Sequence, residues 1–426
     1  MGKYAIIGFG CAGYHAAKTL SEHCPGSQID VYSNTSESPA NPMLTTYYVA
    51  GRIPRNQLFP FGSKEEVLNR LPIRLLENTA VKHVYAGRRQ IETEDGTVRE
   101  YDDIIIATGS EPLVFPIPGC PEKDVYVMRT PADADAFLDR IHVGIGSALV
   151  IGASWVGIKV IEALKAHGVP RMILADMAPR IFPTATLPHT ADQIHDYLRT
   201  EGVELLFGSG IQSMRREADG IVSIFGNGRE VKTDVVALCL GMRSSVGCLD
   251  REEIAIGRAV QVNSRMQTSM PHIYAAGDCC ETLELVTGQY MAVNLWANAR
   301  MQGEVAALNI AGIPAEYQGN FLHNIAHFLN MDFIGLGDNR AKGERITYMS
   351  PGGWQLEMIV GDGRILCVNL LDNRGLSGPL KAILLKRLVG SDSRQHLSMD
   401  EIVALKKAGL PCEIIRFIEG GEHGNT

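Results

Sequence analysis

The feature that most constrains the fold is a glycine-rich loop directly after a short apolar run near the start of the chain. Residues 4–7 read Tyr-Ala-Ile-Ile, and Gly8, Gly10 and Gly13 follow in the spacing Gly-x-Gly-x-x-Gly before a helix-like stretch. The first glycine of such a loop permits a tight turn, the second lets backbone approach a pyrophosphate, and the third lets helix pack on strand. The helix N-terminus would then face the phosphates. The motif predicts a nucleotide-binding strand–turn–helix unit, provided that the rest of the chain supplies the other parts.

The composition favours a folded α/β protein. A length of 426 residues is enough for two or three domains, and the chain has 45% hydrophobic residues and 44 glycines. The formal net charge of −8 argues against nucleic acid as a partner, because phosphate contacts need clustered Lys and Arg. No apolar run is long enough to span a bilayer, and the amino end lacks a signal-peptide pattern. We therefore expect a cytoplasmic protein without a membrane segment.

The cysteine pattern supports neither a metal site nor a dithiol. Nine cysteines are scattered along the chain, and none forms Cys-x-x-Cys. Cys279 and Cys280 are adjacent, which suits neither a common metal spacing nor an easy disulfide. We interpret them as packed or half-exposed thiols rather than as a redox pair, and we predict no metal.

A second unit repeats the opening pattern. An apolar run at residues 148–151 leads into Gly152, Ser154 and Gly157, with serine in the middle glycine position. The next predicted strand ends at Asp176, at the spacing expected for an acid on a ribose 2′-hydroxyl. A carboxylate there repels a 2′-phosphate, so NADH is preferred over NADPH, although Arg180 lies close enough to soften the preference. The matching strand of the first unit, Gln28–Tyr32, ends at Ser33 instead of an acid.

Three further apolar runs end in turns. They stop at Ala107-Thr108-Gly109, at Gly241 and at Gly277-Asp278. In open α/β sheets, ligands bind at such carboxyl ends of strands. Asp278 could accept hydrogen bonds from ligand hydroxyls, or it could be a simple turn or cap residue.

The remaining pattern suggests other elements. Residues 75–85 and 90–101 resemble strands of a small antiparallel insert with a hairpin turn at Asp95-Gly96. The segment from Pro39 begins as a loop and turns helical after Pro42. Residues 293–311 form a long predicted helix, and the pattern then changes to strands at 333–335, 354–360 and 365–369. Two helices follow, at 379–388 and after Ser398, where Glu401 completes a capping box, and residues 420–426 look frayed.

Together these parts resemble the FAD-dependent pyridine-nucleotide disulfide oxidoreductase superfamily, over nearly the whole chain. The shared features are two nucleotide units with the second inserted into the first, an Ala-Thr-Gly strand end and a late Gly-Asp strand end. The resemblance implies an α/β fold with two Rossmann-like domains and a C-terminal α+β interface domain of a homodimer. It also implies an FAD domain in two parts, at residues 1–115 and 243–319. The NADH domain would lie between them at 116–242, and the interface domain would follow at 320–426.

The same resemblance implies the cofactor contacts. FAD pyrophosphate would lie on the first glycine loop, the flavin beside Thr108 and Gly109, the ribityl chain at Asp278 and adenine at the Val81 backbone. The full set of residues predicted to contact FAD or NADH is Gly8, Gly10, Ala12, Gly13, Ser33, Asn41, Pro42, Val81, Ala107, Thr108, Gly109, Gly152, Ser154, Trp155, Val156, Gly157, Asp176, Gly241, Gly277, Asp278, Leu295 and Trp296.

The loop at residues 33–52 decides which branch the chain resembles. Disulfide reductases and NADH oxidases carry a redox-active cysteine at or near this region, but the loop here has none, and Met43 occupies about the relevant place. A thiolate is therefore unavailable where the flavin could reduce it. The loop is similar instead to those of nitrite-reductase flavin domains and rubredoxin or ferredoxin reductases, with Pro42 fitting and Asn41 replacing an Arg. The stretch from Leu295 and Trp296 is similar to a helix that points its N-terminus at the flavin there.

Two residues are candidates for a catalytic role. Relatives of the ferredoxin-reductase branch pair a Lys and a Glu beside the flavin, at positions that are Thr46 and Lys159 here. A buried ammonium without a carboxylate would deprotonate, find another anion, or face one from ligand or flavin. Lys159 therefore either favours the anionic reduced flavin or an acidic acceptor, or it is a solvated helix residue. Trp155 is either a gate over the nicotinamide or a packed core residue.

The sequence therefore predicts an FAD flavoprotein that accepts a hydride from NADH. Without a dithiol, electrons would leave directly from the flavin, with a protein carrier such as ferredoxin, rubredoxin or an iron–sulfur subunit as acceptor. The alternatives are direct reduction of a small molecule or oxygen, and a non-catalytic flavin- or NADH-sensing subunit of a complex.

Overall fold

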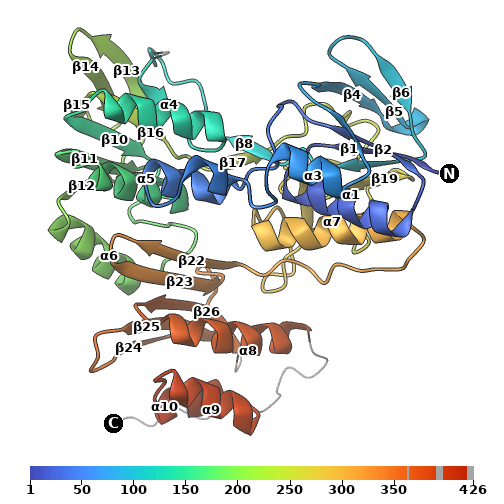
Figure 1. Ribbon diagram of the computed structural model, residues 1–426. Helices are drawn as coiled ribbons and strands as arrows, with labels where there is room; N and C mark the ends of the chain where they lie inside the picture. Colours follow the sequence, from blue (N-terminus) through green and yellow to red (C-terminus); the bar gives the residue numbers. More distant parts are fainter. Residues whose placement is uncertain (122, 362–363, 390–396, 420–426) are drawn as a thin grey trace.

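The computed structural model describes residues 1–121, 123–361, 364–389 and 397–419. Two α/β units lie side by side, and a C-terminal domain lies below the second of them (Figure 1). The predicted frayed end at 420–426 lies outside the described residues. Within the described part, no helix combines the length and apolar character needed to cross a membrane.

The first unit contains a five-stranded parallel sheet in the order β19-β7-β1-β2-β3. Ile104, Ile105 and Ile106 are fully buried, as expected for a strand covered on both faces. Helices α1 (Cys11–His23) and α7 (Trp296–Ile310) pack closely on each other, and a Cβ at Gly303 would collide with the Ala12 carbonyl. The strands are β1 (Lys3–Ile7), β2 (Gln28–Tyr32), β3 (Arg74–Leu76), β7 (Asp103–Ile106) and β19 (Ile273–Ala275).

The second unit contains another five-stranded parallel sheet, in the order β12-β11-β10-β16-β9. It is inserted in the chain between β8 (Ser110–Pro112) and β17 (Met242–Ser244), which pair with each other. This arrangement confirms the predicted α/β class, while the domain bounds given above stay a prediction. The elements are β9 (Val125–Tyr126), α4 (Pro131–His142), β10 (Ser147–Ile151), α5 (Trp155–Ala166), β11 (Arg171–Asp176), α6 (Pro188–Thr200), β12 (Val203–Phe207) and β16 (Val235–Leu238).

Small sheets accompany the two units. The predicted antiparallel insert exists, and its hairpin turns at Gly96, where φ is +80°. One detail was wrong: Leu75 and Leu76 belong to β3 of the parallel sheet, because the chain first pairs with β2 and only then turns into the insert. The strands are β4 (Val81–Tyr85), β5 (Gln90–Thr93), β6 (Val98–Glu100), β13 (Ile211–Glu217), β14 (Gly220–Phe225), β15 (Glu230–Thr233), β18 (Val260–Gln261), β20 (Cys280–Leu283) and β21 (Tyr290–Met291), with η3 at Ala86–Arg88.

The loop after β2 is helical from Pro42 onward, as predicted. It forms η1 (Pro42–Leu44), α2 (Thr45–Val49), η2 (Arg55–Leu58) and α3 (Lys64–Arg70). Although this segment belongs to the first unit in sequence, α2 packs against α4 and α5 of the second unit. It thereby brings the cysteine-free loop to the junction between the two units.

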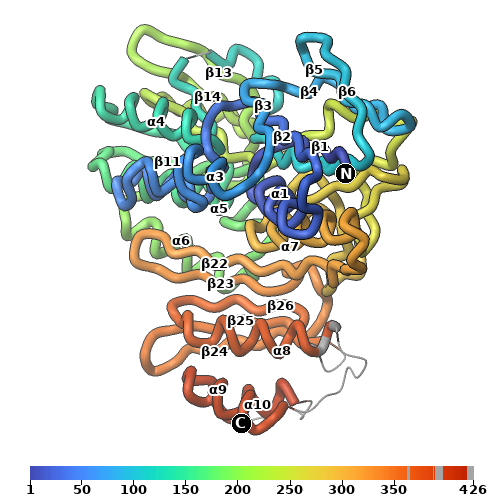
Figure 2. The backbone as a smooth tube through the Cα atoms, turned by 45° about the vertical axis from the view of Figure 1, so that its right-hand side comes forward, coloured from blue at the N-terminus to red at the C-terminus, as the bar shows by residue number. Residues whose placement is uncertain are grey.

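The described part of the C-terminal domain is a five-stranded antiparallel sheet in the order β22-β23-β26-β25-β24, followed by the short helix η4 and by α8, α9 and α10. Phe328 and Phe333 join the core of the second unit, while Leu380 and Ile383 of α8 join the core on the sheet's other face. Figure 2 shows β22 and β23 beside α6 of the second unit, with α8 farther from it. The capping box of Ser398 and Glu401 is confirmed, whereas β22, β24 and α10 were not predicted. The elements are β22 (His323–Phe328), β23 (Met331–Gly337), β24 (Glu344–Met349), β25 (Gln355–Gly361), β26 (Arg364–Leu371), η4 (Arg374–Leu376), α8 (Ser377–Val389), α9 (Met399–Lys407) and α10 (Cys412–Ile418).

Candidate active site

The two glycine loops have the same backbone geometry. Gly8 and Gly152 have φ of +105° and +109°, and a Cβ at either would collide with a carbonyl of the neighbouring strand end. A Cβ at Gly13 would collide with the Gly8 carbonyl, and one at Gly157 with the Gly152 carbonyl. The glycine spacing therefore does at both loops what the sequence predicted: it allows the turn and the close packing of helix on strand.

The middle position distinguishes the two loops. A Cβ at Gly10 would meet nothing within 4 Å, and α1 has no side-chain cap at its N-terminus. At the second loop, the Ser154 hydroxyl accepts from the Gly157 N–H at 3.2 Å and donates to the Cys239 carbonyl at 2.9 Å. The first loop therefore keeps open space and uncapped N–H groups, which is the arrangement that a helix N-terminus offers to a phosphate.

The carboxyl ends of the first sheet bring several predicted residues together. Gly277 lies against Ala12, because a Cβ on it would lie 3.1 Å from the Ala12 Cβ, and Thr108 donates to the Ser245 carbonyl at 2.6 Å. Asp278 accepts from the Ser110 hydroxyl at 2.8 Å and from Arg129 Nη2 at 3.1 Å.

Arg129 is the functional candidate that the sequence reasoning missed at these strand ends. It directly precedes the capping box of Thr130 and Asp133 that starts α4, and this local signal could have drawn attention to the position. Its guanidinium places a cation beside Asp278 and within 3.9 Å of where a Gly109 Cβ would lie.

Three other predicted contacts lie in local structure of the first unit. Ser33 is buried at the end of β2, and its hydroxyl donates to the Thr35 carbonyl at 2.9 Å. Asn41 caps η1 by accepting from the Met43 N–H at 3.0 Å. Val81 starts β4, where it pairs with Thr93. Their contacts with FAD stay a prediction.

Asp176 sits at the end of β11 as predicted. Its carboxylate accepts from the Ala153 N–H of the second glycine loop at 2.7 Å and from the Ala178 N–H at 2.8 Å. These bonds hold the carboxylate beside the loop, where a ribose hydroxyl could still donate to its remaining lone pairs. Arg180 follows on the same loop, and its Nε is buried without a hydrogen-bond partner. Gly241 closes the unit with φ of +103°.

A cavity of about 280 Å³ lies where the two units and the C-terminal domain meet. One wall is the loop of η1 and α2, a second is the start of α5, and a third is β22. Leu295, the uncapped N-cap position of α7, also reaches the cavity, whereas Trp296 turns away to stack on Phe61. The lining residues are Pro42, Met43, Thr45, Thr46, Tyr47, Trp155, Val156, Lys159, Leu295, His323, Asn324, Ile325 and Ala326.

Trp155 is packed against aromatic side chains at the cavity wall, and its role as a gate over the nicotinamide stays a prediction. It lines the cavity, and its ring stacks on Phe182 at 4.2 Å between centroids, with Phe333 of the C-terminal domain at 5.4 Å. Because the indole is held in this aromatic stack, any gating movement must first break the stack.

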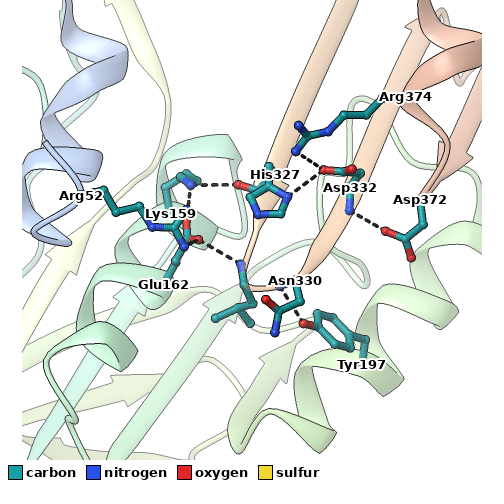
Figure 3. Close-up of polar contacts among 10 residues, drawn as sticks. Arg52, Lys159, Glu162, Tyr197, His327, Asn330, Asp332, Asp372 and Arg374 are labelled. Carbon is teal, nitrogen blue, oxygen red and sulfur yellow. Dashed lines mark hydrogen bonds and ion pairs between the residues drawn. The ribbon is translucent and has the colours of Figure 1, made fainter.

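The structure contradicts one interpretation of Lys159 and leaves the other as a prediction. Lys159 is only 8% exposed, so it is not a solvated helix residue, and its ammonium has a carboxylate partner in Glu162, three residues along α5. The ammonium also donates to the His327 carbonyl at 2.8 Å and lies 4.1 Å from the centre of the Tyr47 ring. Figure 3 shows Lys159, Glu162 and His327 between α5 and the strands of the C-terminal domain. The sequence left three possibilities for a buried Lys159: it loses its proton, it finds another anion in the protein, or it faces an anion of a ligand or the flavin. The structure shows the second, with Glu162 as the anion.

No cysteine lines the cavity, and Met43, 60% exposed, stands on its loop wall. Burial raises the pKa of Cys11 to about 12, and it also raises the pKa of Cys279 and, well above its ordinary value, that of Cys280. Cys279 and Cys280 are buried, which confirms that they are packed thiols. In the described ranges, no group of three or more His, Cys, Asp or Glu could hold a metal ion.

Comparison with known proteins assigns the fold and the family. The family model described as pyridine nucleotide-disulphide oxidoreductase matches residues 2–303. The chain is 28% identical to an NADH oxidase of Methanocaldococcus jannaschii, over 85% of this chain and 80% of that protein. It is 25% identical to the epsilon subunit of the NADH-dependent phenylglyoxylate dehydrogenase of Aromatoleum evansii, over 90% and 92%. A solved covalent complex of putidaredoxin reductase with putidaredoxin matches with a TM-score of 0.83 and 21% identity, over 96% of this chain and 99% of that one.

Proposed function

The chain belongs to the pyridine nucleotide-disulphide oxidoreductase family and is an NAD(P)H-dependent oxidoreductase, and on that premise we propose that it is an FAD enzyme that transfers electrons from NADH to an electron-carrier protein. The carrier would be a ferredoxin, a rubredoxin or an iron–sulfur subunit. The observation that carries the proposal is the cavity at the junction of the two units. The start of α5, directly after the second glycine loop, forms part of its wall, and no cysteine is among its lining residues.

The residues of the first loop fit FAD. Gly10 has open space around it and α1 is uncapped, so the pyrophosphate would bind at its free N–H groups. Asp278 and Arg129 would face the polar chain of the cofactor at the strand ends. When bound, FAD would accept two electrons at once and release them singly, which is the chemistry that the protein side chains lack.

The second loop fits NADH. Its backbone repeats the first loop, and Asp176 is held beside it by the Ala153 N–H. A carboxylate at this place accepts from a ribose hydroxyl and repels a 2′-phosphate, which supports a preference for NADH over NADPH. Trp155 and Val156, directly after this loop, line the cavity and would orient the nicotinamide end.

Direct exit of electrons from the flavin follows from the absence of a thiol. By the family resemblance, Met43 occupies about the place of a redox-active cysteine, and none of the residues that line the cavity can form a disulfide. The cavity wall also carries exposed apolar side chains, with Met43 60% and Ile325 53% exposed. A carrier protein could cover such a rim. The proposal that the partner is an electron carrier is supported by the similarity to a dehydrogenase subunit and to the reductase in the putidaredoxin complex.

The test is an anaerobic stopped-flow experiment with two stages. NADH should bleach the flavin absorbance, and a ferredoxin or rubredoxin should then restore it much faster than air does. Rapid reoxidation by air would support an oxidase, the alternative that the similar NADH oxidase favours. If NADH does not bleach the flavin, the catalytic proposal is wrong and a sensing subunit takes its place.

A further inference from the structure

Glu162 is a buried carboxylate just behind the cavity wall. It lies on α5, is 2% exposed, and does not line the cavity itself. One carboxylate oxygen pairs with Lys159, and the other pairs with Arg52 and accepts from the Leu329 N–H at 3.1 Å. Figure 3 shows Arg52 and Lys159 converging on this side chain.

The three partners of Glu162 belong to the three walls of the cavity. Arg52 lies shortly after the end of α2, whose loop forms the first wall, and Lys159 lies on α5, which forms the second. Leu329 is in the turn between β22 and β23, and β22 forms the third wall. One carboxylate therefore connects three segments that are far apart in the sequence and that enclose the same space.

The turn between β22 and β23 is a firm anchor. The His327 carbonyl accepts from Lys159 at 2.8 Å, and the Asn330 N–H donates to the Tyr197 hydroxyl of α6 at 2.9 Å. The His327 ring bonds Asp332 at 2.7 Å, and Asp332 in turn pairs with Arg374 (Figure 3). Because the turn is fixed on both sides, a change at Glu162 is transmitted to α5 and to the loop after α2.

The carboxylate also balances charge. The groups that contact the Lys159 ammonium are Glu162 on its own helix, the Tyr47 ring of α2 and the His327 backbone carbonyl of β22, and Arg52 pairs with the other oxygen of Glu162. Glu162 is the one anion among these four. Without it, a buried ammonium would lie beside a second cation, and burial would then favour release of its proton.

We propose that Glu162 is a positioning residue of the active site, which holds the Lys159 ammonium at the cavity wall and fixes the spacing of the loop, α5 and β22. The assignment of the cavity as the flavin site rests on the proposed function. The contacts by which Glu162 connects the three wall segments do not depend on it.

The first test uses the cofactor-free protein. In the Glu162→Gln variant, amide hydrogen exchange should rise in residues 45–52 and 328–331 together. The matched control is Glu357→Gln, because Glu357 is also a buried carboxylate (3% exposed) that joins the second unit to the C-terminal domain, through the Thr190 N–H and hydroxyl at 2.8 Å each. That variant should raise exchange near residues 187–191 instead.

The second test measures the reduction potential of bound FAD against pH, without NADH or acceptor. In Glu162→Gln the potential should exceed the wild-type value most at acidic pH, where Lys159 keeps its proton, and the difference should shrink as pH rises. The difference should be absent in the Lys159→Met/Glu162→Gln double variant and in Glu357→Gln. Glu162→Asp, which keeps the charge, should follow the wild-type pH dependence, and it serves if the glutamine variant does not fold.

The outcomes separate the two proposals. If wild-type protein binds no FAD, the proposed function fails, and the exchange experiment still tests Glu162. If wild-type protein binds FAD that NADH reduces, but Glu162→Gln matches wild type at every pH and changes exchange only locally, the positioning role is wrong and the proposed function stands.

Discussion

The two glycine loops of this chain share a backbone and differ in what occupies their middle position. At the first loop the space around Gly10 is open and α1 is uncapped, whereas at the second the Ser154 hydroxyl caps α5 from within. A second difference lies at the end of the following strand, where Ser33 stands in the first unit and Asp176 in the second. The comparison shows that the same glycine spacing gives the same turn, whereas one side chain at the middle position determines whether the helix N-terminus is capped.

The largest effects should come from adding a methyl group at the first glycine of either loop, which tests whether the shared backbone geometry is needed. Gly8→Ala and Gly152→Ala should each lower the free energy of unfolding by at least ~2 kcal/mol, because the positive φ is strained and the new Cβ collides with a carbonyl. Gly8→Ala should also lose FAD, while Gly152→Ala should keep FAD that NADH no longer reduces. Absorbance spectra and denaturant unfolding measure both effects.

The control for these variants is Gly144→Ala. Gly144 also has a positive φ, of +97°, but a Cβ there would meet nothing within 4 Å. Gly144→Ala should lower the free energy of unfolding by about 1 kcal/mol from backbone strain alone, and it should leave the binding of both nucleotides unchanged. If Gly8→Ala behaves like this control, the shared geometry of the loops has no role in cofactor binding.

The strand-end difference predicts nucleotide preference. Asp176→Asn removes a charge that would accept from the NADH ribose and repel a 2′-phosphate, so kcat/KM for NADH relative to NADPH should fall about tenfold or more, since bonds to charged groups contribute about 1.5–3 kcal/mol. Steady-state kinetics with both nucleotides measures the ratio. Asp196→Asn, at an exposed aspartate of the same unit, should leave it unchanged, and an unchanged ratio in Asp176→Asn would disprove the role of Asp176.

Exchanging the residues at the middle position tests whether the difference in helix capping affects nucleotide binding. Gly10→Ser should weaken FAD binding roughly fivefold, because the new hydroxyl would cap α1 as Ser154 caps α5 and a cap contributes about 1 kcal/mol. Ser154→Gly should change the KM for NADH less than about twofold, since replacing a cap by glycine costs only a few tenths of a kcal/mol. Equal effects of the two substitutions would show that the loops do not differ in the way proposed.

The smallest expected effect concerns the thiols. Burial raises the pKa of Cys11 and Cys239 to about 12, so about one molecule in ten thousand carries either thiolate at pH 8. Iodoacetamide at pH 8 should label the exposed Cys412 and leave NADH-dependent activity unchanged. Labelling of the buried thiols should increase only as pH rises toward their pKa. Loss of activity with labelling at pH 8 would indicate a thiol in the reaction.

The sequence predicted the local parts of this molecule well. The glycine loops, Asp176 and the Ser398–Glu401 cap follow from spacing within one segment, and the structure confirms their local geometry. Glu162 lies three residues from Lys159 on one helix, so this partner could also have been found from the sequence.

The parts that depend on distant segments could not be predicted. The His327 carbonyl reaches Lys159, and Arg52 reaches Glu162, from distant parts of the chain. Trp155 likewise stacks on Phe182 and Phe333, which are separated from it by many residues. The edge strand β22 carries polar residues such as His323 and Asn324, so its sequence lacks the apolar alternation that would have predicted a strand. It nevertheless forms a wall of the cavity.

The central claim is that electrons pass from NADH to the flavin and leave it without a thiol, and one titration tests this most directly. Purified enzyme is titrated with NADH under anaerobic conditions while the flavin and thiol content are followed. The account predicts that one NADH per flavin completes the reduction and that no thiols are gained. Uptake of two NADH per flavin, with new thiols appearing, would reveal a second two-electron centre and contradict it.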